Sequence, residues 1–257
     1  MHLDEIFVIN MDRDTQRLEQ FDMMMKRCNL GYTRFPAINP NQLTAEQQML
    51  KEQYVSKHHG LRNVGEIGCT LSHLSLWKMM LDRHYDHILI FEDDARTVNP
   101  SPHILDAVYE FYDYLEKEKK EEPDVLYLGK CCDYCLQMER VHNDVFLSQR
   151  PYCNHAYIMT RKGAEKLLNM GQFEKIQDVE IARAIKRKEI TVMVFHPSIF
   201  FQDVIGNKSG LRGISWAMRN TIDCDDVYTE SSLPWIWAAA ICVLLVLVLI
   251  GLLIWRW

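Results

Sequence analysis

The chain has 257 residues and a formal net charge of −6, and its 29 lysine and arginine residues are scattered rather than gathered into one arm or stripe. Nucleic-acid-binding domains carry a clustered basic surface, so this pattern argues against nucleic acid as a partner. Residues 1–215 are enough for one large α/β domain with a single hydrophobic core.

The first predicted strand is the apolar run Ile6-Phe7-Val8-Ile9, which ends in a polar loop that begins at Asn10. Leu18, Phe21 and Met25 then recur at helical spacing, and Gly31 is expected to end this helix. A strand, a loop and a helix in this order are typical of an α/β fold.

The next elements alternate in the same way. Residues 32–38 are predicted to be extended, a helix is expected to begin near Thr44, and residues 55–64 have no periodicity and are predicted to be a loop. Gly65 and Gly68 are expected to break the chain before a helix whose apolar face is formed by Leu71, Leu74, Trp77 and Leu81.

The remaining elements are strands and helices in turn, predicted at residues 88–91, 104–115, 125–128, 156–159, 162–170 and 190–195. Strands that alternate with helices at this spacing predict an α/β fold with a mostly parallel sheet, covered by helices on both faces.

Residues 234–254 form an apolar run without a charged side chain. A helix of this length covers roughly 30 Å at ~1.5 Å per residue, which is the thickness of a bilayer's hydrocarbon core. Tryptophans, which favour the headgroup region, lie at both ends of the run. We therefore expect a transmembrane helix, joined to the domain by a linker at 216–233; a buried core helix is the alternative.

The N-terminus lacks the basic region and the long apolar core of a signal peptide. The predicted span is then the only anchor, inserted after synthesis, and a cytosolic domain is favoured over a lumenal one. Seven of the eight cysteines lie outside the span, and reduced thiols suit the cytosol. Whether Cys131, Cys132, Cys135 and Cys153 are free, paired or bound to zinc stays open, because no second close pair of ligands accompanies them.

Three consecutive carboxylates, Glu92-Asp93-Asp94, follow the buried strand at 88–91. They are expected at the carboxyl edge of the sheet, where open α/β folds bind ligands. Mg²⁺ and Mn²⁺ are usually held by one or two carboxylates together with substrate phosphates, so the triplet suggests a metal and a nucleotide diphosphate. The alternatives are a metal-dependent phosphoesterase or acidic residues that merely decorate a loop.

An ordered set of motifs adds to this reading. It comprises Ile6 to Asn10 with Arg13 and Arg17, Arg34 to Ile38, Gly65 to His73 with Trp77, Ile90 to Asp94, Tyr127 to Gly129, Ala156 to Thr160, and Gly163-Ala164 with Leu167-Leu168. With this set the chain resembles glycosyltransferase family 25, which includes lipopolysaccharide-modifying enzymes and the procollagen galactosyltransferases.

The resemblance implies a GT-A fold and a hexosyl transfer from a UDP-sugar, with galactose or glucose favoured. It also implies Mn²⁺ (or Mg²⁺) as the cofactor and inversion of configuration at the sugar carbon. The acceptor would be a hydroxyl of a glycan, a glycolipid or a hydroxylysine-like residue. A catalytically inactive sugar-binding protein with the same fold is the alternative.

By the same resemblance, Glu92 and Asp94 are the expected metal ligands, and His196 after the last strand is a candidate third ligand. Asp93 is expected to point elsewhere and to contact the donor. Asn10 and Arg13 suit the base and the phosphate of the donor, since arginine forms charge-assisted hydrogen bonds with phosphate.

Gly65, Glu66, Ser72 and His73 are expected to contact the donor in the same cleft. Gln202 and Ser209 resemble the closing element of the family's donor site.

An inverting transfer needs a general base within hydrogen-bond reach of the acceptor hydroxyl, and Asp178 is the candidate. The alternative role for Asp178 is that of a helix N-cap.

Overall fold

The computed structural model describes residues 1–56, 63–131, 133 and 138–203. Within them the chain forms an 8-stranded sheet with the order β2-β1-β3-β8-β5-β9-β7-β6. The strands are β1 (Glu5–Asn10), β2 (Thr33–Pro36), β3 (His87–Glu92), β5 (Val125–Cys131), β6 (Glu139–His142), β7 (Val145–Leu147), β8 (Tyr152–Thr160) and β9 (Val192–Phe195).

The sheet is mixed, although most of its strands point the same way. β1 is parallel to β2 and β3, and β5 is parallel to β9. β8 lies antiparallel between β3 and β5, and β7 lies antiparallel between β9 and β6. The predicted mostly parallel α/β sheet is therefore confirmed, with β8 and β7 as the strands that run against the others.

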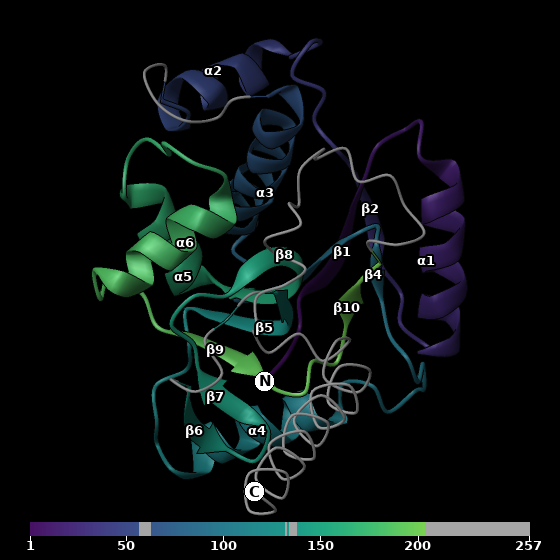
Figure 1. The fold of residues 1–257 in the computed structure, drawn as a ribbon, viewed down its shortest axis with the longest axis vertical. Helices are drawn as coiled ribbons and strands as arrows, with labels where there is room; N and C mark the ends of the chain where they lie inside the picture. The colour runs from purple at the N-terminus through teal and green to yellow at the C-terminus, as the bar shows by residue number, and fades with distance from the viewer. Residues whose placement is uncertain (57–62, 132, 134–137, 204–257) are drawn as a thin grey trace, which may run out of the picture.

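Central strands such as β3 are mostly apolar because both faces of the sheet are covered (Figure 1). In β3, Ile88 and Ile90 pack against one set of helices, and Leu89 and Phe91 pack against the other. The first set is α2 (Ala45–Tyr54), α3 (Val64–Asp82), α5 (Arg161–Asn169) and α6 (Gln177–Lys186), and the second is α1 (Thr15–Arg27) and α4 (Asp106–Lys117).

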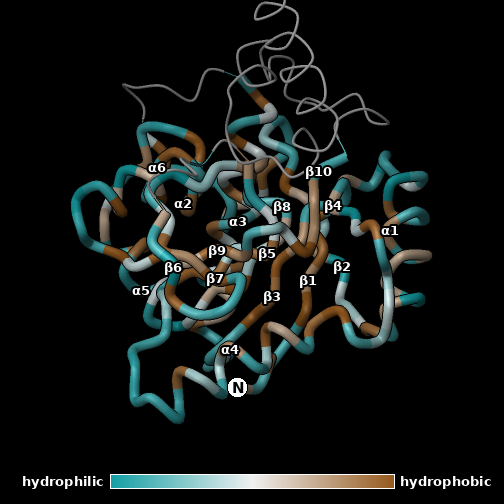
Figure 2. The backbone as a smooth tube through the Cα atoms, turned by 60° about the horizontal axis from the view of Figure 1, so that its bottom comes forward, coloured by the Kyte–Doolittle hydropathy of each residue, from teal (hydrophilic) through white to brown (hydrophobic). Residues whose placement is uncertain are grey.

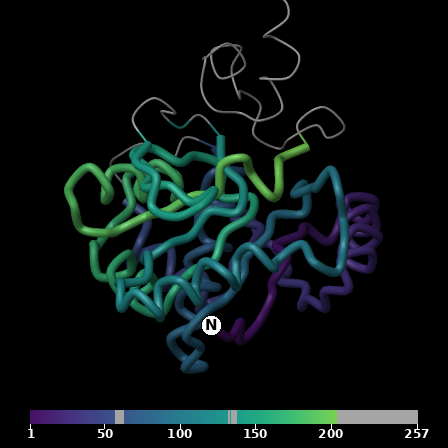
Figure 3. Tube along the Cα trace, turned by 90° about the horizontal axis from the view of Figure 1, so that it is seen from below, coloured from purple at the N-terminus to yellow at the C-terminus, as the bar shows by residue number. Residues whose placement is uncertain are grey.

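Figure 2 shows this core as hydrophobic colour along β1 and β3 inside a hydrophilic periphery. Viewed from below, α1 and the helices that follow β8 lie on opposite sides of the molecule (Figure 3). The two buried clusters of side chains on either face of the sheet are thus separated by the sheet itself.

Helix α3 begins earlier than the sequence predicts. Gly65 and Gly68 were expected to break the chain, but α3 begins at Val64 and includes both glycines. The side chain of Asn63 caps it by accepting a hydrogen bond from the backbone N–H of Glu66. A Cβ atom at Gly68 would lie 2.6 Å from the carbonyl oxygen of Ile38, so this glycine allows the helix to pack closely against that loop.

A second, 2-stranded sheet pairs β4 (Ala95–Arg96) with β10 (Phe201–Gln202). The pairing is antiparallel and sets Gln202 opposite Ala95. Neither strand was predicted, because a two-residue strand has no periodicity to detect. Its consequence is that the end of the described chain returns to the acidic triplet.

No helix within the described ranges is both long enough and apolar enough to cross a membrane. The predicted linker at 216–233 and the predicted span at 234–254 lie outside those ranges, as do Cys132, Cys135 and Ser209. The membrane anchor therefore stays a prediction from the sequence.

Candidate active site

Many of the predicted site residues meet at a cleft of about 380 Å³ beside the ends of β1 and β3. Ligands bind at this edge of open α/β sheets because the loops diverge there. The walls come from the loop after β1, α1, residues 37–41, the first turns of α3 and the acidic triplet. The predicted residues among them are Arg13, Gly65, Ser72, His73, Glu92, Asp93, Asp94 and Gln202.

Asp93 and Asp94 share the guanidinium of Arg17. Nη2 of Arg17 lies 2.9 Å from Oδ1 of Asp93 and 2.7 Å from Oδ2 of Asp94. Both carboxylates are buried, so the shared cation offsets part of the cost of removing them from water. Even so, burial raises the pKa of Asp93 above its ordinary value.

Asp94 has one oxygen that is bonded and one that is not. Its Oδ2 atom pairs with Arg17 and accepts a hydrogen bond from Nε2 of Gln202 over 3.2 Å. Its Oδ1 atom is buried and has no hydrogen-bond partner among the residues that the structure describes. Burial and the nearby charge of Glu92 together raise the pKa of Asp94 to about 6. A cation at Oδ1 would relieve both the missing contact and the repulsion.

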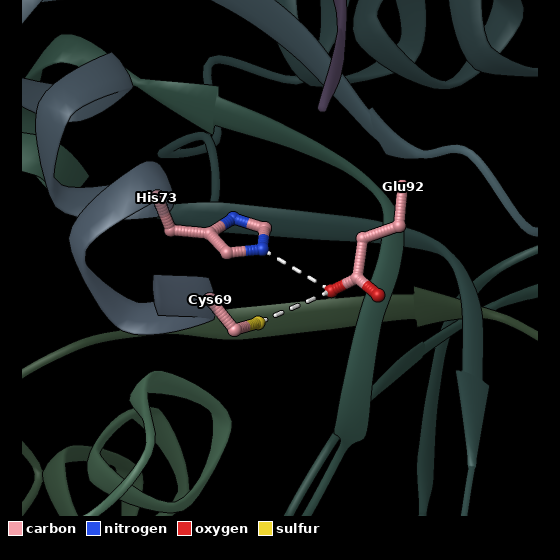
Figure 4. A group of neighbouring side chains, drawn as sticks. All are labelled: Cys69, His73 and Glu92. Carbon is pink, nitrogen blue, oxygen red and sulfur yellow. Dashed lines mark hydrogen bonds and ion pairs between the residues drawn. The ribbon is translucent and has the colours of Figure 1, made fainter. Parts of the chain in front are cut away.

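Glu92 points the other way, toward α3. Its Oε1 atom lies 3.2 Å from Nε2 of His73 and 3.8 Å from Sγ of Cys69 (Figure 4). Burial favours a higher pKa for Glu92, but the hydrogen bond with His73 and the electrostatic influence of His73, His155 and Arg17 together outweigh it, so the pKa is lowered. Glu92 is therefore ionised in the folded protein at neutral pH.

His73 is held from behind by a buried hydrogen-bond chain. Its Nδ1 atom lies 2.8 Å from the hydroxyl oxygen of Tyr157, which accepts a hydrogen bond from Nε1 of Trp77 over 2.9 Å. Because Trp77 uses the oxygen as an acceptor, the hydroxyl hydrogen is available for Nδ1 of His73. In that tautomer Nε2 of His73 carries the hydrogen that points at Glu92.

Asn10 connects elements instead of facing the cleft. Its Nδ2 atom donates to Oδ2 of Asp93 over 2.7 Å and to the carbonyl of Asp14 over 3.0 Å. Its Oδ1 atom accepts from Nε of Arg34 over 2.9 Å. The side chain is buried and these bonds occupy it, so in this structure it fixes Asp93 rather than presenting a group to a donor.

Ser72 and Glu66 also have local partners. The Ser72 hydroxyl donates to the carbonyl of Gly68 over 2.7 Å and accepts from the backbone N–H of Ile38 over 2.9 Å, which holds residues 37–41 against α3. Glu66 accepts a hydrogen bond from Nδ2 of Asn63 over 2.9 Å at the beginning of α3. Ser72 lines the cleft, whereas Glu66 does not.

Arg13 is the exposed cation of the cleft wall. Its side chain is 75% exposed, and its Nε atom lies 3.9 Å from Oδ2 of Asp14. A long, solvated arginine with one distant partner can turn toward an incoming anion at little cost. Arg13 therefore has the freedom that a phosphate contact needs.

Asp178 lies in the first turn of α6, and the N-cap of that helix is Ile176. One of its oxygens accepts from the backbone N–H of Cys153 over 3.1 Å, and the other accepts from that of Val179 over 2.7 Å. Burial raises the pKa of Asp178 against these hydrogen bonds, and the charge of Glu92 raises it further. Asp178 is thus an electrostatic neighbour of the triplet, although it does not line the cleft.

His196 lies outside the cleft. It follows β9, its ring packs edge-on against Phe146 with the ring centres 6.0 Å apart, and its backbone N–H donates to the carbonyl of Asp144. The structure therefore does not bring His196 to Glu92 and Asp94, because the chain turns away after β9 before it returns through β10.

Two residues of the site had no predicted role. Arg17 is the third residue of α1, and Cys69 lies four residues before His73 on α3. The spacing of Cys69 and His73 was a usable signal, because residues four apart share a face of a helix. Arg17 gave no such signal, since its partners come from a distant strand.

The comparisons agree with this geometry. The model of "Glycosyltransferase family 25 (LPS biosynthesis protein)" matches residues 3–185. The chain belongs to this family. Its relatives include a "Glycosyltransferase 25 family member" of Drosophila melanogaster, 28% identical over 195 residues, and "Procollagen galactosyltransferase 2" of Mus musculus, 28% identical over 191 residues.

Each of these alignments covers 70% of the family 25 chain and 30% of the relative, so the chain spans under a third of the proteins it matches. Among solved structures, a UDP-glucose pyrophosphorylase complexed with UDP-glucose aligns with a TM-score of 0.40 and 11% identity, over 76% of this chain and 90% of that one. That likeness is too weak to carry an inference.

Proposed function

We propose that the chain is a GT-A-type glycosyltransferase that transfers a hexose, galactose or glucose, from a UDP-sugar to a hydroxyl acceptor on a glycan, a glycolipid or a hydroxylysine-like residue. The observation that carries the proposal is Oδ1 of Asp94, a buried carboxylate oxygen in a cleft that Arg13 borders, for which the described part of the chain supplies no hydrogen-bond partner. Family membership supports the reaction class, and the name of the mouse relative supports galactose.

The residues of the cleft fit a divalent cation of the Mn²⁺ or Mg²⁺ type. Asp94 offers an unused buried oxygen, and Glu92 is kept ionised beside it. These oxygen ligands match the preference of hard cations. A cation held by Glu92 and Asp94 would supply charge stabilisation for the diphosphate that leaves the sugar.

The other residues then have separate tasks. Arg13 binds the diphosphate, and Gly65 in the first turn of α3 lets the donor approach the backbone closely. Arg17 keeps Asp93 and Asp94 in place through the two contacts of its guanidinium. Asp178, whose pKa is raised by burial, accepts the proton of the acceptor hydroxyl as the general base.

The proposed anchor is independent of this chemistry. Residues 234–254 would hold the enzyme at a membrane, with the domain at 1–215 in the cytosol. Protease treatment of intact membrane vesicles tests the orientation. A cytosolic domain is digested without detergent, whereas a lumenal domain is protected until detergent is added.

A screen of UDP-sugars tests the enzymatic proposal. The full-length protein in detergent is incubated with Mn²⁺, each UDP-sugar and a panel of acceptors, and released UDP and the glycosylated product are measured. Asp94→Asn should abolish transfer, and the matched control is Asp113→Asn at an exposed position of α4. Binding of UDP without turnover would favour the inactive sugar-binding alternative. If the protein shows no turnover and does not bind UDP, both readings are refuted.

A further inference from the structure

Cys69, His73 and Glu92 form a group of potential metal ligands with a chemistry different from that of the Asp94 oxygens. Their ligand atoms all lie within 4.8 Å of one another. Cys69 and His73 are four residues apart on α3, and Glu92 reaches toward them from the end of β3 (Figure 4). A sulfur, an imidazole nitrogen and a carboxylate oxygen therefore converge on one point.

The spacing is close to what zinc requires. Zinc bonds of about 2.3 Å to sulfur and about 2.0 to 2.1 Å to nitrogen or oxygen place tetrahedral ligand atoms roughly 3.3 to 3.6 Å apart. Glu92 Oε1 lies 3.2 Å from His73 Nε2 and 3.8 Å from Cys69 Sγ. In two of the three ligand pairs, the separation between the atoms needs to change by only a few tenths of an ångström.

The sulfur has a supporting partner behind it. Nε2 of Gln177 donates to Sγ of Cys69 over 3.2 Å, and Oε1 of Gln177 in turn accepts from the hydroxyl of Thr70 over 3.0 Å. Gln177 and Thr70 are both buried. Outer hydrogen bonds of this kind orient metal ligands, and a donor aimed at sulfur stabilises a thiolate.

The imidazole of His73 also has a supporting hydrogen-bond partner behind it. Nε2 of a zinc-bound histidine loses its hydrogen, so Nδ1 must carry one and donate it. Nδ1 of His73 lies 2.8 Å from the Tyr157 oxygen, which has a second lone pair besides the one used by Trp77. The hydrogen-bond chain behind His73 can therefore serve the metal-bound tautomer without any movement of heavy atoms.

We propose that Cys69, His73 and Glu92 form a binding site for Zn²⁺ or a similar thiophilic divalent cation, with the fourth position open to the cleft. All three residues line the cleft, so water or a ligand can reach the metal. Three protein ligands and one open position are typical of zinc sites that exchange a ligand. Mg²⁺ does not compete for this set, because thiolate and imidazole suit softer ions.

The site shares Glu92 with the proposed Mn²⁺ site. A zinc ion on the α3 side withdraws Glu92 from Asp94, so the two metals cannot both use this carboxylate fully. This consequence rests on the proposed function, whereas the zinc site itself does not. The test of the zinc site must therefore measure metal binding directly rather than turnover.

Cobalt is the probe, because Co²⁺ bound to a thiolate gives a charge-transfer band in the near ultraviolet. Full-length, metal-free, reduced protein in detergent is titrated with Co²⁺ and then with Zn²⁺. We expect one cobalt per chain with this band, its displacement by one equivalent of Zn²⁺, and no displacement by a large excess of Mg²⁺. Absence of the band in the wild-type protein would overturn the proposal.

Variants locate the cobalt. Cys69→Ser should remove the band, while Cys28→Ser should keep it, because Cys28 is buried on the opposite face of the sheet. Gln177→Leu should keep the band and weaken zinc affinity by about 10- to 100-fold, as loss of an outer hydrogen bond does. A band that survives Cys69→Ser but disappears in Cys135→Ser would place the metal elsewhere and overturn the proposal.

X-ray absorption of the zinc-loaded wild-type protein covers the case in which Cys69→Ser fails to fold. The proposed site requires one sulfur at about 2.3 Å and nitrogen or oxygen ligands at about 2.0 Å. A zinc shell without sulfur, or one with three or four sulfurs, contradicts it. Either result leaves the transferase proposal standing, because that proposal is tested by UDP release.

Discussion

Nη2 of Arg17 lies 2.7 Å from Oδ2 of Asp94, and this contact joins the first turn of α1 to the loop that follows β3. The same nitrogen lies 2.9 Å from Asp93, so one guanidinium serves two buried carboxylates. This contact lets three acidic residues stand together at the edge of a sheet before any metal binds.

Arg17→Met should therefore destabilise the metal-free protein. Removing one partner of a buried ion pair costs about 3 kcal/mol, and here two carboxylates lose their cation. The loss should be smaller at pH 5 than at pH 7, because protonated carboxyl groups no longer repel. Urea unfolding at both pH values measures it. Arg27→Met, at an exposed position of the same helix, is the control, and an equal loss in both variants would contradict the shared-cation role.

Asp94 should make metal-free stability depend on pH. Its pKa is raised from 3.8 to about 6, so the folded protein binds this proton more tightly than the unfolded chain does. The contribution of Asp94 to stability is then greatest below pH 4, falls as the pH rises from about 4 to 6, and leaves a penalty of up to roughly 3 kcal/mol above that window.

Asp94→Asn should lack this trend. Urea unfolding at pH 4.5 and pH 7 in the presence of a chelator gives the difference between the wild-type protein and the variant. Mn²⁺ at pH 7 should stabilise only the wild-type protein, since a bound ligand stabilises the folded state that holds it. Identical pH profiles for the two proteins would show that Asp94 is not perturbed.

Asp178→Asn should slow transfer without weakening donor binding. A general base contributes about 10²- to 10⁴-fold to the rate, and an amide cannot take the proton. The check is kcat and KM for the donor, with UDP affinity by calorimetry. Glu180→Gln is the matched control, because Glu180 is a buried acid of the same helix that accepts from the backbone N–H groups of Glu174 and Lys175. Glu180→Gln should lose stability and keep kcat. A parallel loss of UDP affinity in Asp178→Asn would show that Asp178 binds the donor instead of acting as the base.

Gly68→Ala should disturb the cleft wall. The added Cβ would lie 2.6 Å from the carbonyl oxygen of Ile38, and this backbone oxygen can move only with the loop at 37–41. Overpacking of this kind costs typically 1 to 3 kcal/mol, more than the gain in helix propensity. Thermal unfolding and UDP affinity should both fall. Gly31→Ala is the control, because a Cβ atom at Gly31 has no atom of the described residues within 4 Å. A similar loss in Gly31→Ala would show that the close approach at Gly68 is not the cause.

The amino-acid sequence alone determines the elements of this fold well. Apolar runs such as Ile88 to Phe91 and helical periodicities such as Leu71 to Leu81 are local properties, and the strands and helices follow them. The position of the acidic triplet at the carboxyl edge of the sheet also follows from the sequence, because it comes directly after a buried strand. The ordered motifs carried the family resemblance that the family match confirms.

Tertiary structure decided which side chains meet. Arg17 reaches Asp94, and Cys69 and His73 reach Glu92, only because β1 and β3 are parallel neighbours with Ile9 beside Glu92. In the same packing the Ser72 hydroxyl donates a hydrogen bond to the carbonyl of Gly68 in its own helix, and His196 lies outside the cleft. Local sequence patterns report burial and backbone geometry, whereas strand order and register, on which these distant contacts depend, emerge when the two faces of the sheet are packed.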